Sequence, residues 1–331
     1  MNRIFIFLLS VFMGSLSAQT RNPNDPNLFV ADPFVLEDNG VYYLYGTSSR
    51  DGIVVWRSAD LVYWEGPCGA TDGLALHKND SWGERNFWAP EVYKINGRYV
   101  MTYSVEEHIA VAESSSPLGP FVQSEKKPLL DERGIDSHIF IDDDGTPHLY
   151  WVRFQGGNII YTARMSRDLK TVDMTTARHC ITPQQGTWER TDAPPLANVA
   201  EGPFVIKRND KYYLSYSCNH YQSKDYAVGW AVANKPEGPW TRYENNPVLL
   251  RHNGYVGTGH HAFLQTSSGK IYIVYHAHNS QTAIAPRRTL ISECWWDTFP
   301  CFLKVDPGSI ELEKSDVQQP APAGNLIRFN P

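Results

Sequence analysis

Long hydrophobic runs, basic clusters and closely spaced cysteine pairs are all scarce in this chain of 331 residues. The one extended apolar run, residues 4–13, is well short of the ~20 residues that a membrane-spanning helix needs. The net charge is −6 without a basic cluster, which argues against nucleic acid as a partner. The five cysteines form no C-x-x-C pair, which argues against a zinc or redox motif, and their odd number leaves at least one thiol unpaired.

The N-terminal segment has the composition of a secretory signal peptide. Arg3 supplies the positive charge, an apolar stretch follows, and small residues end at Ser17 and Ala18. We therefore expect residues 1–18 to be removed, leaving a secreted or periplasmic protein that does not stay attached to a membrane. At the other end, residues 316–331 are polar and rich in proline, and we expect them to lie along the surface.

Aromatic residues make up 13% of the chain, and many of them recur within a repeated pattern. In each repeat a small or acidic residue precedes a short apolar run, a polar turn and a second run that contains tyrosine. The turns centre on Gly40, Gly97, Gly145, Asp210 and Gly269. The five segments are ADPFVLEDNGVYYLYGTS, APEVYKINGRYVMTYS, DSHIFIDDDGTPHLYWV, EGPFVIKRNDKYYLSYS and GHHAFLQTSSGKIYIVYHA.

This repeat predicts an all-β fold, a five-bladed β-propeller over residues 22–315. Each unit contains two strands joined by a tight turn, and further short strands follow before the next unit. Repeats of about 40–60 residues with four short strands each are typical of propeller blades. Two tandem β-sandwiches are the alternative, but no Pro/Ser-rich linker divides the chain. We expect a single domain and a monomer.

The repeat also brings acidic residues to one place. In a propeller the first strand of each blade lines the central axis, so its leading residue points toward one end of that axis. Counting eight or nine residues back from each turn gives Asp32, Ala89, Asp136, Glu201 and His260. Three carboxylates from three blades should therefore converge, and repulsion should raise the pKa of at least one of them. Two carboxylates can hydrolyse a glycosidic bond, one as acid and one as base.

The chain resembles glycoside hydrolase family 43 in the motifs ADPFV, FWAPEVYKINGRYVMTYS, IDSHIFIDDDG, AEGPFVIKRNDKYYLSYS and GTGHHAF. The resemblance implies a five-bladed propeller and an inverting mechanism. Because only a short tail follows the fifth repeat, we expect no appended β-sandwich, in contrast to larger relatives. It implies that Asp32 is the general base and Glu201 the general acid. Asp136 would raise the pKa of Glu201 and help to orient it. No cofactor would be needed for the chemistry.

Further site residues are expected from the same resemblance. Trp88 would border the cleavage subsite, and Arg288, rather than the adjacent Arg287, would contact the sugar. Phe34 and His138 are further candidates for substrate binding. His260 would lie near the axis, where related enzymes often hold a calcium ion or a water. The acidic turn DDDG, residues 142–145, is interpreted as a turn and not as a calcium loop.

The predicted function is exo-acting hydrolysis of side chains on a plant-type polysaccharide or oligosaccharide. An α-L-arabinofuranosidase is favoured, with β-D-xylosidase, exo-galactosidase and endo-arabinanase as alternatives. Two other classes are a non-catalytic sugar-binding propeller and a protein-interaction propeller. Neither of them needs three acids at matched repeat positions, and the acids therefore favour the enzyme.

Overall fold

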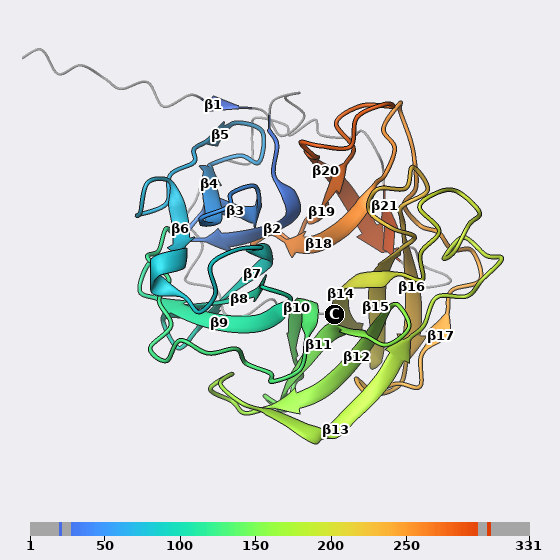
Figure 1. Ribbon diagram of the computed structural model, residues 1–331, viewed down its shortest axis with the longest axis horizontal. Coiled ribbons are helices and arrows are strands. Elements are labelled where there is room, and N and C mark those ends of the chain that lie inside the picture. Colours follow the sequence, from blue (N-terminus) through green and yellow to red (C-terminus); the bar gives the residue numbers. More distant parts are fainter. Residues whose placement is uncertain (1–19, 22–27, 297–302, 306–331) are drawn as a thin grey trace, which may run out of the picture.

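The computed structural model describes residues 20–21, 28–296 and 303–305, and it arranges them as five sheets around a central axis (Figure 1). The predicted signal peptide, the predicted C-terminal tail and Cys301 lie outside the described residues. The five-bladed propeller predicted from the repeats is confirmed. In the described part of the chain, no helix has the length and apolar character needed to cross a membrane.

Each sheet begins with the inner strand supplied by one of the five repeated segments. The first sheet holds β2 (Ala31–Asp38), β3 (Val41–Thr47), β4 (Gly52–Ser58), β5 (Trp64–Glu65), β6 (Leu74–His77) and β1 (Thr20–Arg21). The second holds β7 (Trp88–Ile95), β8 (Arg98–Val105) and β9 (His108–Ser114), and the third holds β10 (Gly134–Ile141), β11 (Pro147–Phe154), β12 (Asn158–Met165) and β13 (Val172–Ile181). The fourth holds β14 (Ala200–Arg208), β15 (Lys211–Cys218), β16 (Ala227–Ala233) and β17 (Thr241–Arg242), and the fifth holds β18 (Gly259–Gln265), β19 (Ile271–Ala277), β20 (Arg288–Trp296) and β21 (Leu303–Val305). A single 3-10 turn, η1 (Lys78–Asp80), is the one helical element in the described residues.

The predicted hairpins form where the turn residues accept a left-handed backbone. Asn39 and Gly40 join β2 to β3 with φ values of 52° and 75°, and Asn96 and Gly97 join β7 to β8 in the same way. Two successive positive φ values match the twist of the flanking strands, which is why Asn-Gly favours such turns. The acidic segment 142–145 is a turn as predicted, since the amide of Gly145 donates to the carbonyl of Asp142 at 2.8 Å.

The second sheet has three strands where the repeat predicts four. After β9 the chain passes through Pro117 and Pro120, which have no amide hydrogen to donate to a ladder. Only an isolated bridge between Glu113 and Val122 marks the position of a fourth strand. The remainder of the predicted strand is irregular because its backbone cannot pair continuously.

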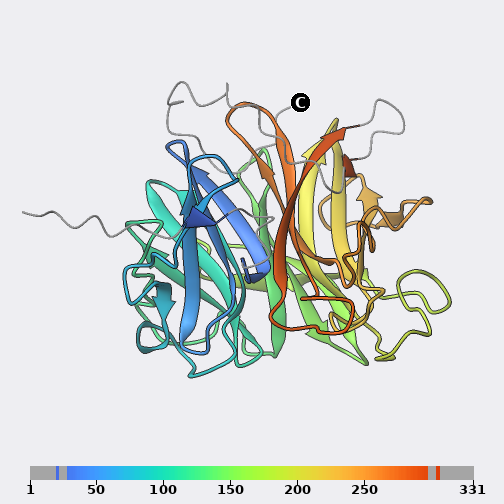
Figure 2. The same ribbon diagram turned by 90° about the horizontal axis from the view of Figure 1, so that it is seen from above.

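The cores lie between neighbouring sheets. Figure 1 shows the sheets arranged around the axis, and Figure 2 shows them from a direction turned by 90°. For example, Trp230 of β16 stacks on Phe263 of β18 with ring centroids 5.2 Å apart. The ring closes where the segment before β2 pairs with β20: Val30 and Thr289 exchange hydrogen bonds of 2.6 and 3.2 Å, and the amide of Thr289 donates to Leu28. This closure brings residues from opposite ends of the chain to the axis.

Candidate active site

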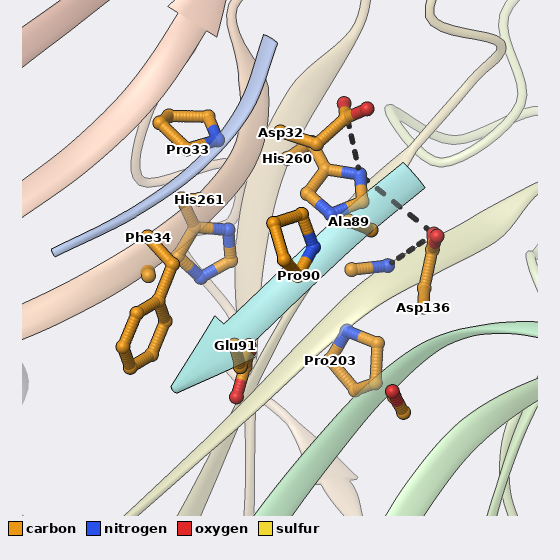
Figure 3. Close-up of a pocket in the computed structure, with 13 residues that line it drawn as sticks. Asp32, Pro33, Phe34, Ala89, Pro90, Glu91, Asp136, Pro203, His260 and His261 are labelled. Atoms are coloured by element: carbon orange, nitrogen blue, oxygen red, sulfur yellow. Dashed lines mark hydrogen bonds and ion pairs between the residues drawn. The ribbon is translucent and has the colours of Figure 1, made fainter. Parts of the chain in front are cut away.

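All five inner strands carry a β-bulge at the same place, close to the axis. In each of them two residues are skipped between successive pairs with the second strand. The first skipped residue always has a left-handed backbone, with φ between 44° and 57°. Bulges re-aim side chains, and here these residues line a common axial pocket. They are Asp32, Ala89, Asp136, Gly202 and His260 (Figure 3).

The predicted equivalence of Glu201 with the other axial residues is wrong by one position. Gly202 occupies the bulge of the fourth blade, and Glu201 is the last paired residue before it, opposite Ser217. The error follows from turn length: a tight two-residue turn follows β14, whereas longer turns follow β10 and β18. Counting eight residues back from Asp210 gives Gly202, and counting nine gives Glu201. The carboxylate of Glu201 therefore approaches the axial group from a neighbouring strand position.

Asp32 is a buried carboxylate surrounded by cationic and imidazole groups. Arg287 donates to both of its oxygens, at 2.7 Å to Oδ1 and 3.3 Å to Oδ2. The Nδ1 atoms of His260 and His276 lie 3.4 and 3.3 Å from Oδ1. Burial alone would raise the pKa of Asp32, but Arg287 and then His260 outweigh it and hold that pKa well below its usual range. Asp32 is therefore ionised near neutral pH.

His276 contributes to this environment as a neutral ring. Burial, followed by the charge of Arg287, lowers the pKa of His276 to about 3. The amide of Asp32 lies 3.3 Å from Nδ1 of His276 and donates to it, which assigns the ring hydrogen to Nε2. The ring also stacks between Tyr226 and His260. His276 thus fixes the backbone of Asp32 and the position of the two neighbouring rings.

Asp136 and His260 face Asp32 across the axis. His260 lies between the two carboxylates, 3.4 Å from Asp32 and 3.7 Å from Asp136 (Figure 3). Burial alone would lower the pKa of His260, but Asp32, Asp136 and Glu201 together raise it. Burial, with repulsion from Glu201 and Asp32, raises the pKa of Asp136 to about 7 despite the opposing effect of His260. The expectation that at least one converging acid has a raised pKa is met by Asp136.

Glu201 is held by side chains at the start of the third strands of two blades, the third and the fourth. Tyr226 donates from its hydroxyl to Oε1 at 2.8 Å, and Asn158 donates from its amide to Oε2 at 2.9 Å. Asn158 begins β12, and Tyr226 immediately precedes β16. Gly259 leaves the space for the tyrosine ring, because a Cβ atom there would lie 2.4 Å from it. Both oxygens of Glu201 are thus fixed in orientation.

The third strands supply a second set of site residues that the sequence reasoning missed. Asn158, Tyr226 and Arg287 stand at or just before the start of β12, β16 and β20. The signal available in the sequence was their matching place in three repeats, before NIIYTARM, AVGWAVA and RTLISECWW. The ring of Tyr221 lies against the guanidinium of Arg287, whose central carbon is 4.8 Å from the ring centre.

The sugar contact expected of Arg288 stays a prediction, and the arginine that contacts the acids is the adjacent Arg287. Arg287 contacts Asp32, whereas Arg288 donates to the carbonyl of Asn279 at 2.6 Å and lies over the ring of Phe29. Consecutive residues at the start of a strand point to opposite faces of the sheet, so only one of the two can reach the axis.

Three other predicted substrate contacts lie in different surroundings. Trp88 is partly exposed in β7, at the strand position that matches Glu201. Phe34 and His138 are buried below the bulges. His138 Nδ1 lies 2.9 Å from Glu91, and its Nε2 accepts from the amide of Val205 at 3.0 Å. Both ring nitrogens of His138 are therefore engaged within the core.

His260 lies on the axis beside Asp32 and Asp136, where the resemblance implies a calcium ion or a water. A calcium ion takes six to eight oxygen ligands. Within the described part of the chain no group of three or more His, Cys, Asp or Glu side chains has an arrangement suited to a metal. The axial cavity has a volume of about 10 Å³, which is room for about one water.

The arrangement suits proton transfer by paired carboxylates. Asp32 is ionised at a pH where the neighbouring Asp136 still holds a proton. Environments that separate the pKa values of neighbouring acids define an acid and a base. Cleavage of a glycosidic bond needs such a pair. The fold and the site together define a β-propeller of the glycoside hydrolase class.

Comparisons with known proteins give the family. The model for glycosyl hydrolases family 43 matches residues 21–299, and the chain belongs to this family. A solved structure named endo-1,4-β-xylanase from Bacteroides thetaiotaomicron is 40% identical, with a TM-score of 0.78 over 88% of this chain and 97% of that one. A β-xylosidase of Xylanibacter ruminicola is 29% identical over 76% of this chain and 88% of its own length. An extracellular exo-α-(1→5)-L-arabinofuranosidase of Cellvibrio japonicus is 24% identical over 80% and 84%. The predicted family and enzyme class are confirmed.

Proposed function

We propose that this glycoside hydrolase is an exo-acting, inverting α-L-arabinofuranosidase on plant-type polysaccharide or oligosaccharide side chains. The observation that carries the proposal is the meeting of three buried carboxylates, Asp32, Asp136 and Glu201, near the axis of a family 43 propeller. The relatives are named for arabinofuranose and xylose substrates, so β-D-xylosidase is the second candidate.

In the proposed mechanism Asp32 acts as the general base. Its carboxylate takes a proton from a water that attacks the anomeric carbon, on the face opposite to the leaving group. Arg287, which donates to both oxygens of Asp32, keeps this carboxylate oriented and contacts the bound sugar. The proton taken from the water is held by the carboxylate of Asp32 until it is lost to solvent.

Glu201 is the proposed general acid. It delivers its proton to the glycosidic oxygen as the bond to the leaving group breaks. Tyr226 and Asn158 fix the two oxygens of Glu201, which supports delivery along a single direction. Asp136, with its raised pKa, holds a proton near neutral pH. It helps to orient Glu201 because its Oδ2 accepts the amide of Gly202, the next residue along the chain. A partly exposed Trp88 would border the sugar.

A panel of aryl glycosides tests the proposal. We expect release of the aryl group from the α-L-arabinofuranoside to be fastest, with the Asp32→Asn variant as the inactive control. Fastest release from the β-D-xyloside or a galactoside would replace the proposed sugar but keep the mechanism. No release from any glycoside by the pure wild-type protein, with oligosaccharide arabinans and xylans also untouched, would refute the enzyme assignment at this site.

We also propose that the protein is exported and acts as a monomer. The N-terminal segment with the composition of a signal peptide supports export, and one relative is named extracellular. N-terminal sequencing of protein recovered from the producing cell should begin after Ser17 or Ala18. An intact N-terminus on all of the active protein would contradict export by this route.

A further inference from the structure

The five bulges are tied to one another by a repeated hydrogen bond between blades. In four blades the amide of the bulge residue donates to a side chain of the preceding blade. The acceptor stands at the same place each time, opposite the residue that precedes the bulge in its own blade. The pairs are Ala89 to Thr47 at 3.0 Å, Asp136 to Ser104 at 3.0 Å, His260 to Ser217 at 2.8 Å and Asp32 to His276 at 3.3 Å.

The bond between the third and fourth blades is the exception. The corresponding residue of the third blade is Val152, which lies opposite Ile135. The side chain of Val152 has no polar atom that could accept a hydrogen bond. Its side chain is buried in the apolar cluster that joins these two blades. The amide of Gly202 donates instead to Oδ2 of Asp136, at 3.2 Å. The exception therefore falls at the one junction where Asp136 meets the segment that carries Glu201, the proposed general acid.

We propose that Val152 is a positioning residue for Asp136 and Glu201. Because the side chain of Val152 offers no hydroxyl, the amide of Gly202 is left to bind the carboxylate of Asp136. This bond fixes Asp136 relative to the peptide that joins Glu201 to Gly202. A hydroxyl at position 152 would compete for the amide of Gly202. The hydroxyls of Ser104 and Ser217 accept the amides of Asp136 and His260 in this way. The inference rests on the proposed function only for its kinetic consequences.

The geometry of blade one shows that a hydroxyl fits this position. Thr47 stands at the equivalent place and accepts the amide of Ala89 at 3.0 Å. Threonine has nearly the shape of valine, so Val152→Thr changes one methyl group into a hydroxyl. The loss of an amide donor disfavours the ionised carboxylate, and Val152→Thr should therefore raise the pKa of Asp136 further.

Other groups around Asp136 also affect its titration and must stay constant in the test. His260 faces it from β18, Glu201 from β14 and Asp32 from β2, and the hydroxyl of Tyr226 lies against Glu201. Arg287 acts on Asp32 rather than on Asp136 directly. None of these groups is changed by a substitution at position 152.

The test compares Val152→Thr with wild type by carbon-13 NMR titration of labelled aspartate, with Asp136→Asn used for assignment. We expect the midpoint of Asp136 to rise by about one pH unit, which corresponds to the loss of one donor to a charged group. We expect kcat to fall by roughly 10-fold with KM changed less than about twofold, and the pH–rate profile to shift with the titration. Val152→Ser, which copies Ser104 and Ser217, carries the same test if the threonine variant does not fold.

Two control variants separate the proposal from a general loosening. Val152→Ala reduces the packing at this position and Val152→Ile crowds it, and neither adds a hydroxyl. Both should lose stability while the midpoint of Asp136 and the pH profile stay unchanged. An unchanged midpoint in the hydroxyl variants, or an equal shift in either control, would overturn the proposal. A shifted midpoint together with full activity in Asp136→Asn would support the positioning role and refute the catalytic role of Asp136.

Discussion

Replacing Asp136 with asparagine should stabilise the folded protein above about pH 7, and should change its pH-dependent stability little below about pH 4. The pKa of Asp136 is raised from 3.8 to about 7, chiefly by burial. Between these two pH values the folded state holds a proton that the unfolded chain has released. Folding stability is therefore lost as the pH rises through this window, and asparagine, which cannot ionise, escapes that loss.

The size of the effect follows from the same two values. A change from 3.8 to about 7 corresponds to about 4 kcal/mol of unfolding free energy, at about 1.4 kcal/mol for each pH unit. Over the accessible part of the window, from about pH 5 to about pH 8, we expect the difference between variant and wild type to grow by about 3 kcal/mol. At roughly 2 °C for each kcal/mol, Tm should diverge by about 6 °C.

Thermal or urea unfolding of both proteins at several pH values measures this difference. Comparing pH values cancels any packing cost that does not depend on pH, and the asparagine oxygen can still accept the amide of Gly202. Asp131→Asn, at an exposed position, is the matched control and should follow wild type at every pH. A constant difference between the Asp136 variant and wild type across the range would refute the reasoning, because it would mean that Asp136 does not gain a proton on folding.

Three further predictions concern the chemistry. Glu201→Gln should lose most activity on substrates with poor leaving groups but retain more on aryl glycosides with acidic ones, while Asp32→Asn should lose both; equal losses in the Glu201 variant would argue against its role as the acid. Arg287→Ala should lower kcat/KM roughly 100-fold because it leaves the buried Asp32 without its main partner, whereas Arg288→Ala should change it less than about threefold; the reverse order would contradict the geometry. Proton NMR of the first sugar released should show the opposite anomer to the substrate, as inversion requires, and a retained anomer would exclude an inverting mechanism.

The repeated pattern in the sequence was sufficient to predict the propeller and the axial position of three groups. Each unit combines β-branched and aromatic runs with a turn that accepts positive φ, and these local preferences act independently of the other blades. Because every blade repeats the same hairpin, its leading residue reaches the same end of the axis. Asp32, Asp136 and His260 could therefore be placed together from spacing alone.

Positions that depend on a single residue of register required the tertiary structure. If the turn after β14 is counted one residue too long, Glu201 is assigned to the bulge position that Gly202 occupies. If the start of β20 is misplaced by one residue, Arg288 is assigned to the face that Arg287 occupies. Side chains alternate from one face of a strand to the other, so an error of one residue reverses what each of them contacts.

The sequence by itself determined the fold, the family resemblance and which kinds of side chain meet at the axis, because short-range turn and strand preferences repeat along the chain. The tertiary structure alone decided which groups set their charge and orientation. Arg287 is 255 residues from Asp32, and Gly202 is 66 residues from Asp136. Such contacts form only when the ring of blades closes, since no local preference of either residue specifies its partner.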